Sequence, residues 1–142
     1  MQTADVIILV ASGCAPSLTG PQLSIFDTEI DQDGIRFGDK LFVFANKTDR
    51  ANDKVESNIK KLKEELKKYR IIYNDDMLSE RVVAGSARAF LEKEGKIEGD
   101  ECLRAVEARG ITDGIKEMLQ KLEKYVTIQS QKNSSQNALH VV

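Results

Sequence analysis

The stretch Leu41-Phe42-Val43-Phe44-Ala45-Asn46-Lys47-Thr48-Asp49 joins five apolar residues to four mostly polar ones. A short apolar run bounded by turn-forming residues predicts a strand that is covered on both faces, as in a parallel sheet. The polar residues then follow the carboxyl end of that strand, where open α/β sheets bind their ligands. We therefore expect residues 41–45 to form a buried strand and Asn46, Lys47 and Asp49 to line a site at its end.

Two further strands are expected, one on each side of this stretch in the sequence. Residues 4–10, Ala-Asp-Val-Ile-Ile-Leu-Val, are largely apolar, and residues 82–85, Val-Val-Ala-Gly, form a second short β-branched run. Helical patterns lie between and after the three runs. This alternation predicts βα units, a parallel sheet and an α/β three-layer sandwich.

Helices are predicted from apolar spacing and from start signals. Pro21 suits the first position of a helix that runs to about Ile30. Asp53 and Glu56 form a capping box for a second helix that ends near Tyr69. Its apolar face is marked by Val55, Ile59, Leu62 and Leu66, at spacings of four, three and four.

The region after the third strand contains a longer helical part and a polar end. Residues 87–94 and 101–109 read as two short helical pieces joined through Gly95 and Gly99. A last amphipathic helix ends near Val126. Residues 127–142 are rich in Ser, Gln and Asn without periodicity, so we expect a flexible tail. Residues 1–126 then form one domain.

A second polar motif follows the third predicted strand. Ser86-Ala87-Arg88 stands after residues 82–85, as Asn46-Lys47-Thr48-Asp49 stands after residues 41–45. The carboxyl ends of parallel strands meet at one edge of a sheet, so both motifs are expected at one site.

Together the two motifs resemble the guanine-recognition motifs of P-loop GTPases. The resemblance covers the carboxyl-terminal half of that domain, over roughly Ala4 to Val126, and Gly20-Pro21-Gln22-Leu23 with residues 44–49 is similar to bacterial dynamin-like GTPases. It implies a partial P-loop GTPase fold, made of the last three strands and their helices, and binding of GTP or GDP through the base. The strands would be the fourth, fifth and sixth of a sheet of order 2-3-1-4-5-6.

The resemblance also implies a role for each motif residue. Asp49 would accept two hydrogen bonds from the guanine ring N–H and exocyclic amine, which adenine cannot supply. Asn46 would brace the loop and Lys47 would lie along the purine face. The Ala87 N–H would donate to guanine O6, with Ser86 holding that turn.

Arg88 departs from the family pattern, since it stands where the family has Lys. Either cation can pack on the base, so Arg88 keeps the position in the predicted site. We assign cofactor-binding roles to these residues and no catalytic or metal-binding role to any residue of the chain.

The motifs for phosphate chemistry are missing from the sequence. No Gly-x-x-x-x-Gly-Lys-Ser/Thr occurs, and the only Gly-Lys pair, Gly95-Lys96, is followed by Ile97. Asp31-Gln32-Asp33-Gly34 fits a switch motif but lies between the first helix and the second strand, the wrong place. Hydrolysis would therefore need the missing amino-terminal half, with Mg²⁺ bound in a full-length relative. Without that half, the free edge of residues 4–10 is expected to bind it or to self-associate.

Composition restricts the other function classes. A net charge of −2 without a basic stripe gives no reason to expect nucleic-acid binding. Cys14 and Cys102 show no metal or redox spacing, and the longest apolar stretch, residues 6–11, is too short to span a bilayer. No signal peptide is evident, so the cytoplasm is the expected location. An EF-hand-like start at Glu29 fails because Lys40 stands where the bidentate Glu is required.

Several alternatives stay open. Asn46 and Asp49 are also typical of a turn that caps the next helix. The chain is alternatively a non-enzymatic interaction module with a degenerate GTPase fold. The segment 87–110 is suited to cover a base, contact a partner or extend a loop. Asp75 and Asp76 are expected in a surface turn.

Overall fold

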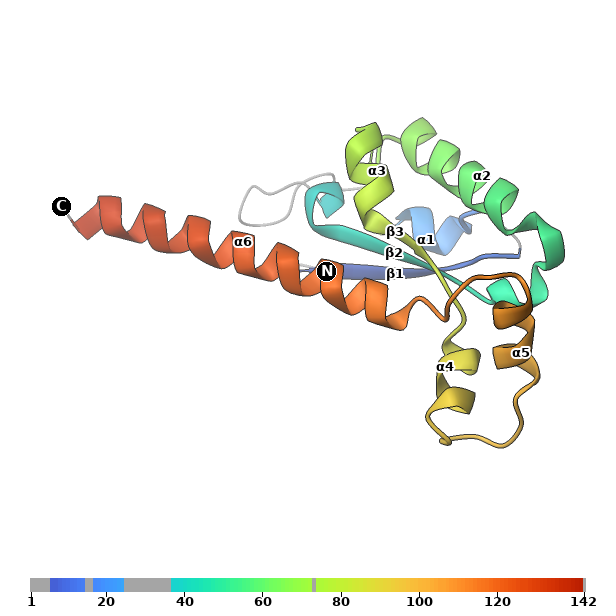
Figure 1. Cartoon of the computed structure of the whole chain (residues 1–142). Helices are drawn as coiled ribbons and strands as arrows, with labels where there is room; N and C mark the ends of the chain where they lie inside the picture. Colours follow the sequence, from blue (N-terminus) through green and yellow to red (C-terminus); the bar gives the residue numbers. More distant parts are fainter. Residues whose placement is uncertain (1–5, 15–16, 25–36, 73, 142) are drawn as a thin grey trace.

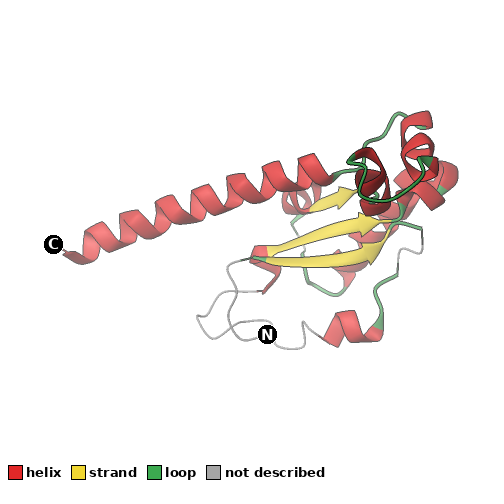
Figure 2. Ribbon diagram, turned by 90° about the horizontal axis from the view of Figure 1, so that it is seen from below, coloured by secondary structure: helices red, strands yellow, loops and turns green. Residues whose placement is uncertain are grey.

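A computed structural model shows a three-stranded parallel sheet covered by helices on both faces (Figure 1). The structure describes residues 6–14, 17–24, 37–72 and 74–141. The strands β1 (Ile7–Ser12), β2 (Leu41–Asn46) and β3 (Val82–Ala84) lie in the order β1-β2-β3. Figure 2 shows them side by side and pointing the same way. The predicted parallel α/β sheet is therefore confirmed.

The central strand β2 is more fully buried than the edge strand β1. Residues 41–45 of β2 are all buried, as the continuous apolar run predicted. In β1, by contrast, Ile7 and Leu9 are buried while Ile8 and Val10 are 49% and 54% exposed. Only one face of β1 is covered, which explains why its apolar side chains alternate between buried and exposed.

Two clusters of apolar side chains fill the two sides of the sheet. On one face, β1 and β2 pack against α1 (Gly20–Ser24), α2 (Val55–Lys68) and α3 (Asp75–Arg81). On the other face, α6 (Ile115–Val141) packs through Met118 onto Phe42, Phe44 and Val83. The sheet and the helices on its two faces thus form three layers.

Short helices complete the chain near the ends of the strands. The 3-10 turns η1 (Phe37–Lys40), η2 (Thr48–Arg50) and η3 (Asn52–Lys54) flank β2 and precede α2. The helices α4 (Ala87–Lys93) and α5 (Glu101–Ala108) form a hairpin at the carboxyl end of the sheet (Figure 1). Their predicted bounds, 87–94 and 101–109, differ by one residue at their carboxyl ends.

The starts of two helices differ from prediction. The capping box at Asp53 and Glu56 is wrong, because α2 begins after Lys54 with no side-chain cap, and Asp53 belongs to η3. Asp75 and Asp76 lie in the first turn of α3, not in a turn between helix and strand. The Asn74 side chain starts this helix by accepting from the Met77 N–H at 3.1 Å.

The end of the chain also differs from prediction. The last helix runs through Val141, so residues 127–141 are helical where the sequence indicated a tail without periodicity. A helix needs an apolar stripe only where it packs against the rest of the protein. Figure 1 shows that α6 projects away from the sheet. The predicted helix from Pro21 to Ile30 is described as far as Ser24. Residues 31–34 and Glu29 lie outside the described residues, whereas Lys40, at the end of the EF-hand-like stretch, belongs to η1.

Within the described ranges, no helix has both the length and the apolar composition needed to cross a bilayer.

Candidate functional site

The carboxyl ends of β2 and β3 are joined by backbone hydrogen bonds. The Gly85 N–H donates to the Ala45 carbonyl at 2.9 Å, and the Thr48 N–H donates to the Gly85 carbonyl at 3.2 Å. A Cβ atom at Gly85 would clash with the Asp113 carbonyl oxygen and lie 2.7 Å from Cζ of Phe44. Only glycine fits there, and this close approach brings the two polar motifs together.

Side chains then link the two motifs directly. The Ser86 hydroxyl donates to Oδ1 of Asp49 at 2.7 Å. The Asn46 Oδ1 accepts from the Ala87 N–H at 2.9 Å. Ser86 is fully buried and also caps α4, since its Oγ accepts from the Ala89 N–H at 3.1 Å. The structure therefore places four of the six predicted site residues within one hydrogen-bonded group.

Lys47 and Arg88 lie at the edge of this group. Lys47 is exposed and has a left-handed backbone with φ 68° and ψ 29°, which is uncommon for a residue other than glycine. Arg88 extends from the first turn of α4, and its Nε lies 4.0 Å from Oε2 of Glu92. Its side chain is 62% exposed, so this ion pair contributes little to stability.

A hollow of about 680 Å³ opens beside Asp49, between the η2 turn and the α4–α5 hairpin. Of the predicted residues, Asp49 and Arg88 line it, whereas Asn46, Lys47, Ser86 and Ala87 do not. The remaining lining residues are Arg50, Glu92, Glu98, Gly99, Asp100, Glu101, Cys102, Arg104 and Ala105. Most of the wall therefore comes from the segment whose role the sequence left open.

Helix α5 contacts the Asn46–Asp49 loop through residues that sequence reasoning missed. Cys102 lies with Asp49 in the wall of the hollow. The Arg109 guanidinium donates through Nη1 to the carbonyls of Thr48 and Asp49, at 3.0 and 3.2 Å. Neither residue belongs to a motif, and both contacts join positions more than 50 residues apart. No local signal in the sequence could have identified them.

These contacts shift two pKa values in opposite directions. Burial alone would raise the pKa of Asp49, but hydrogen bonds from Ser86, from Cys102 and from its own N–H, with the nearby Arg50 charge, outweigh burial and lower it. Burial, together with the bond to Asp49 and its negative charge, raises the pKa of the Cys102 thiol to about 11. At neutral pH, the Asp49 carboxylate is therefore ionised and the Cys102 thiol is protonated.

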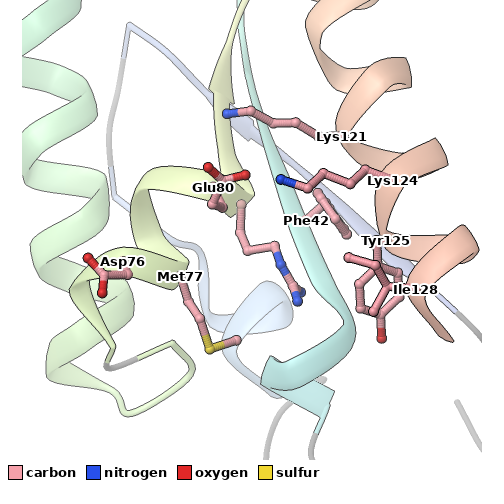
Figure 3. Close-up of a pocket in the computed structure, with 9 residues that line it drawn as sticks. Phe42, Asp76, Met77, Glu80, Lys121, Lys124, Tyr125 and Ile128 are labelled. Carbon is pink, nitrogen blue, oxygen red and sulfur yellow. The ribbon is translucent and has the colours of Figure 1, made fainter. Parts of the chain in front are cut away.

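A second hollow, of about 390 Å³, lies at the opposite end of the strands, between α3 and α6 (Figure 3). The Arg81 guanidinium lies 4.7 Å from the ring centres of both Phe42 and Tyr125. Its Nη1 donates to the Asp39 and Leu41 carbonyls at 2.9 and 3.1 Å. Arg81, which lines this hollow, thus links Phe42 of β2 to Tyr125 of α6. Because Arg81 has this structural role, the hollow beside Asp49 is the better candidate site.

In the part of the chain that the structure describes, no three His, Cys, Asp or Glu side chains gather as a metal-binding group.

No protein-family model, curated protein or solved structure matches this chain.

Proposed function

We propose that the chain recognises guanine nucleotides and forms the base-recognition part of a P-loop GTPase domain. The observation that carries this proposal is the pair of hydrogen bonds between the two motifs, Ser86 to Asp49 at 2.7 Å and Ala87 to Asn46 at 2.9 Å. An ionised carboxylate and a backbone N–H stand together where parallel strands end, and their chemistry complements the N1, N2 and O6 groups of guanine.

Each contact has a stated role in this proposal. Asp49 accepts from the guanine N1–H and the exocyclic amine, and adenine is rejected because it has no matching donors. Ala87 donates its N–H to O6 after that N–H leaves Asn46. Lys47 and Arg88, exposed at the edge, are free to pack on the purine faces.

The proposal assigns no phosphate chemistry to this chain. The 142 residues contain no phosphate-loop motif, so the hydroxyl that would hold Mg²⁺ is absent and the residues here do not fit that ion. Hydrolysis is proposed only for a protein in which this chain is joined to, or bound by, a phosphate-loop segment. Alone, the chain is expected to bind guanine nucleotides weakly and not to hydrolyse GTP.

The first prediction tests base recognition in the full 142-residue chain. Titration with guanosine, GDP and ADP, followed by NMR, should move the Asp49 and Ala87 amide signals with guanine ligands only. Asp49→Asn should weaken guanosine binding by roughly tenfold or more and favour xanthosine, whose C2 carbonyl can accept from the new amide.

Asp53→Asn is the matched control, since Asp53 is an exposed carboxylate in the adjacent η3 turn. It should leave binding unchanged. Guanosine preference that survives Asp49→Asn would reject the assignment.

A second candidate function is a non-enzymatic interaction module. It is favoured by the fact that Asn46 already occupies the Ala87 N–H and that Ser86 already donates to Asp49. A folded chain whose NMR spectrum does not change when guanosine is added at millimolar concentration would support this candidate.

A further inference from the structure

The Arg109 side chain, at the end of α5, binds the backbone of the turn that carries Asp49. Its Nη1 donates to the carbonyls of Thr48 and Asp49 at 3.0 and 3.2 Å, across 61 and 60 positions of sequence. Hydrogen bonds from a charged group are roughly twice as strong as those between neutral groups. One guanidinium thus joins α5 to two successive peptide groups of η2, and Figure 1 shows α5 beside the turn that follows β2.

Both ends of α5 fix the place of Arg109. At its start, the Glu92 side chain of α4, which is only 3% exposed, accepts from the Leu103 N–H at 2.9 Å. In its middle, the Val106 side chain is buried. At its end, Gly110 has φ 68°, a left-handed conformation that stops the helix directly after Arg109. Helix α5 is therefore anchored to α4, and it carries Arg109 to η2.

The η2 turn begins with a conformation that its own sequence does not favour. Lys47, which precedes Thr48, has φ 68°, and such a backbone persists only where surrounding contacts impose it. The bond from the Thr48 N–H to the Gly85 carbonyl, at 3.2 Å, and the two bonds from Arg109 are contacts of this kind. Arg109 therefore helps to hold the backbone from which the Asp49 carboxylate extends.

We propose that Arg109 is a positioning residue of the base site, which orients Asp49 so that its carboxylate pairs with both the N1–H and the exocyclic amine of guanine. Asp49 lines the hollow beside α5, whereas Arg109 does not, so Arg109 acts through the η2 backbone and not on the base. This inference rests on the proposed guanine recognition, and it gives the segment 87–110 a role in base specificity.

The orientation of a carboxylate decides how many donors of a base it can accept. Two donors on one flat edge are accepted together only when both carboxylate oxygens lie near the plane of that edge. A turn that shifts keeps one of the two bonds. Inosine nucleotides keep the N1–H but lack the exocyclic amine, so the preference for guanine over inosine nucleotides reports how well Asp49 is oriented.

The test compares the affinities of GDP and inosine diphosphate, measured by NMR titration of the full 142-residue chain. The native chain should bind GDP about tenfold more tightly, because one hydrogen bond to an ionised group separates the two ligands. Arg109→Ala should reduce this ratio to about threefold or less, since a misplaced carboxylate loses the second bond. A smaller folded fraction would instead weaken both ligands equally and leave the ratio unchanged.

Three further variants make the result specific to Arg109. Arg109→Lys keeps a cation that can donate to the carbonyls, and its ratio should lie between those of the native chain and Arg109→Ala. Arg109→Gln keeps a donor without the charge, and its lowered ratio decides the outcome if the alanine variant does not fold. Glu107→Ala is the matched control, because Glu107 is exposed on the same helix and does not line the hollow. Its ratio should equal the native one.

Hydrogen exchange gives a second readout that needs no ligand. The Thr48 N–H should exchange severalfold faster in Arg109→Ala, because η2 loses the contact that holds it. The Ala89 N–H, bonded to the Ser86 hydroxyl at 3.1 Å, is the internal reference and should keep its rate. Thermal unfolding of each variant verifies that the chain is folded.

The outcomes separate this inference from the proposed function. Nucleotide binding that depends on Asp49, with an unchanged ratio in folded Arg109→Ala or Arg109→Gln, overturns the positioning role alone. An unchanged exchange rate of the Thr48 N–H in a folded Arg109→Ala chain also overturns it. A folded native chain that binds neither nucleotide overturns the proposed function, and this inference with it.

Discussion

Lys47 has a backbone conformation that its side chain does not favour. It connects buried β2 to the η2 turn with φ 68° and ψ 29°, and of the described residues other than glycine only Arg70, at φ 57°, shares a positive φ. A left-handed conformation costs a residue with a Cβ roughly 1–2 kcal/mol. Such strain is often found at binding sites, and Lys47 is exposed directly after β2.

Replacing Lys47 by glycine should relieve the strain and remove the proposed base contact. Glycine also gains entropy in the unfolded state, so we expect Lys47→Gly to stabilise the fold by only about 0.5 kcal/mol while weakening guanosine binding severalfold. Urea unfolding and NMR titration measure the two effects. Arg70→Gly is the control: it should stabilise similarly and leave binding unaltered. A Lys47→Gly chain that binds guanosine as well as the native chain would remove Lys47 from the site.

The Cys102 thiol of α5 lies in the same hollow as Asp49, and its protonation depends on pH. The raised pKa of Cys102, about 11 against an ordinary 9.0, means that the folded state favours the neutral thiol. Its contribution to stability is complete below about pH 9 and is lost as the pH rises through about 11. Above that value, the thiolate and the Asp49 carboxylate repel each other.

The pH dependence of Cys102 alkylation tests this coupling. In a Cys14→Ser background, the rate should keep rising up to about pH 11, because only the thiolate reacts. Asp49→Asn removes the charge and should move the midpoint down toward 9.0, though not fully, since burial is the larger cause. An identical midpoint in both chains would show that the thiol and the carboxylate are uncoupled.

The elements differ in how well the sequence indicated them. The bounds of α4 and α5 were predicted closely because Gly95 and Gly99 interrupt the helical pattern, and both have positive φ. Helix α3 was missed because seven residues starting with two aspartates lack a visible apolar period. The packing of α5 on η2 could not be predicted, since it depends on contacts such as Arg109 to Asp49 between distant positions.

The sheet as a whole presents one incompletely covered strand. Among the described strands, β1 forms one edge, and its Ile8 and Val10 side chains are about half exposed. The free edge was expected only from the resemblance, and the apolar run of residues 4–10 could not show that only one face of β1 is covered. Edge strands with exposed apolar side chains favour association.

We therefore expect the isolated chain to self-associate through β1. Light scattering should give a molecular mass above 15.9 kDa, and Val10→Lys should return it to that value, because a charged side chain at an edge disfavours pairing. Leu91→Lys, at an exposed apolar position on α4, is the control and should leave the mass unchanged. A folded, monomeric native chain would contradict this expectation.

Gly85 couples the rim of the sheet where the two polar motifs lie to the long carboxyl-terminal helix. On one side its missing Cβ leaves room for Asp113, whose carbonyl accepts from the Ser86 N–H at 2.9 Å and whose carboxylate accepts from the Ile115 N–H at the start of α6. On the other side it admits the Phe44 ring. Any larger residue would displace both, so a mutational survey should find position 85 intolerant of every replacement, even in a screen that selects only for folding.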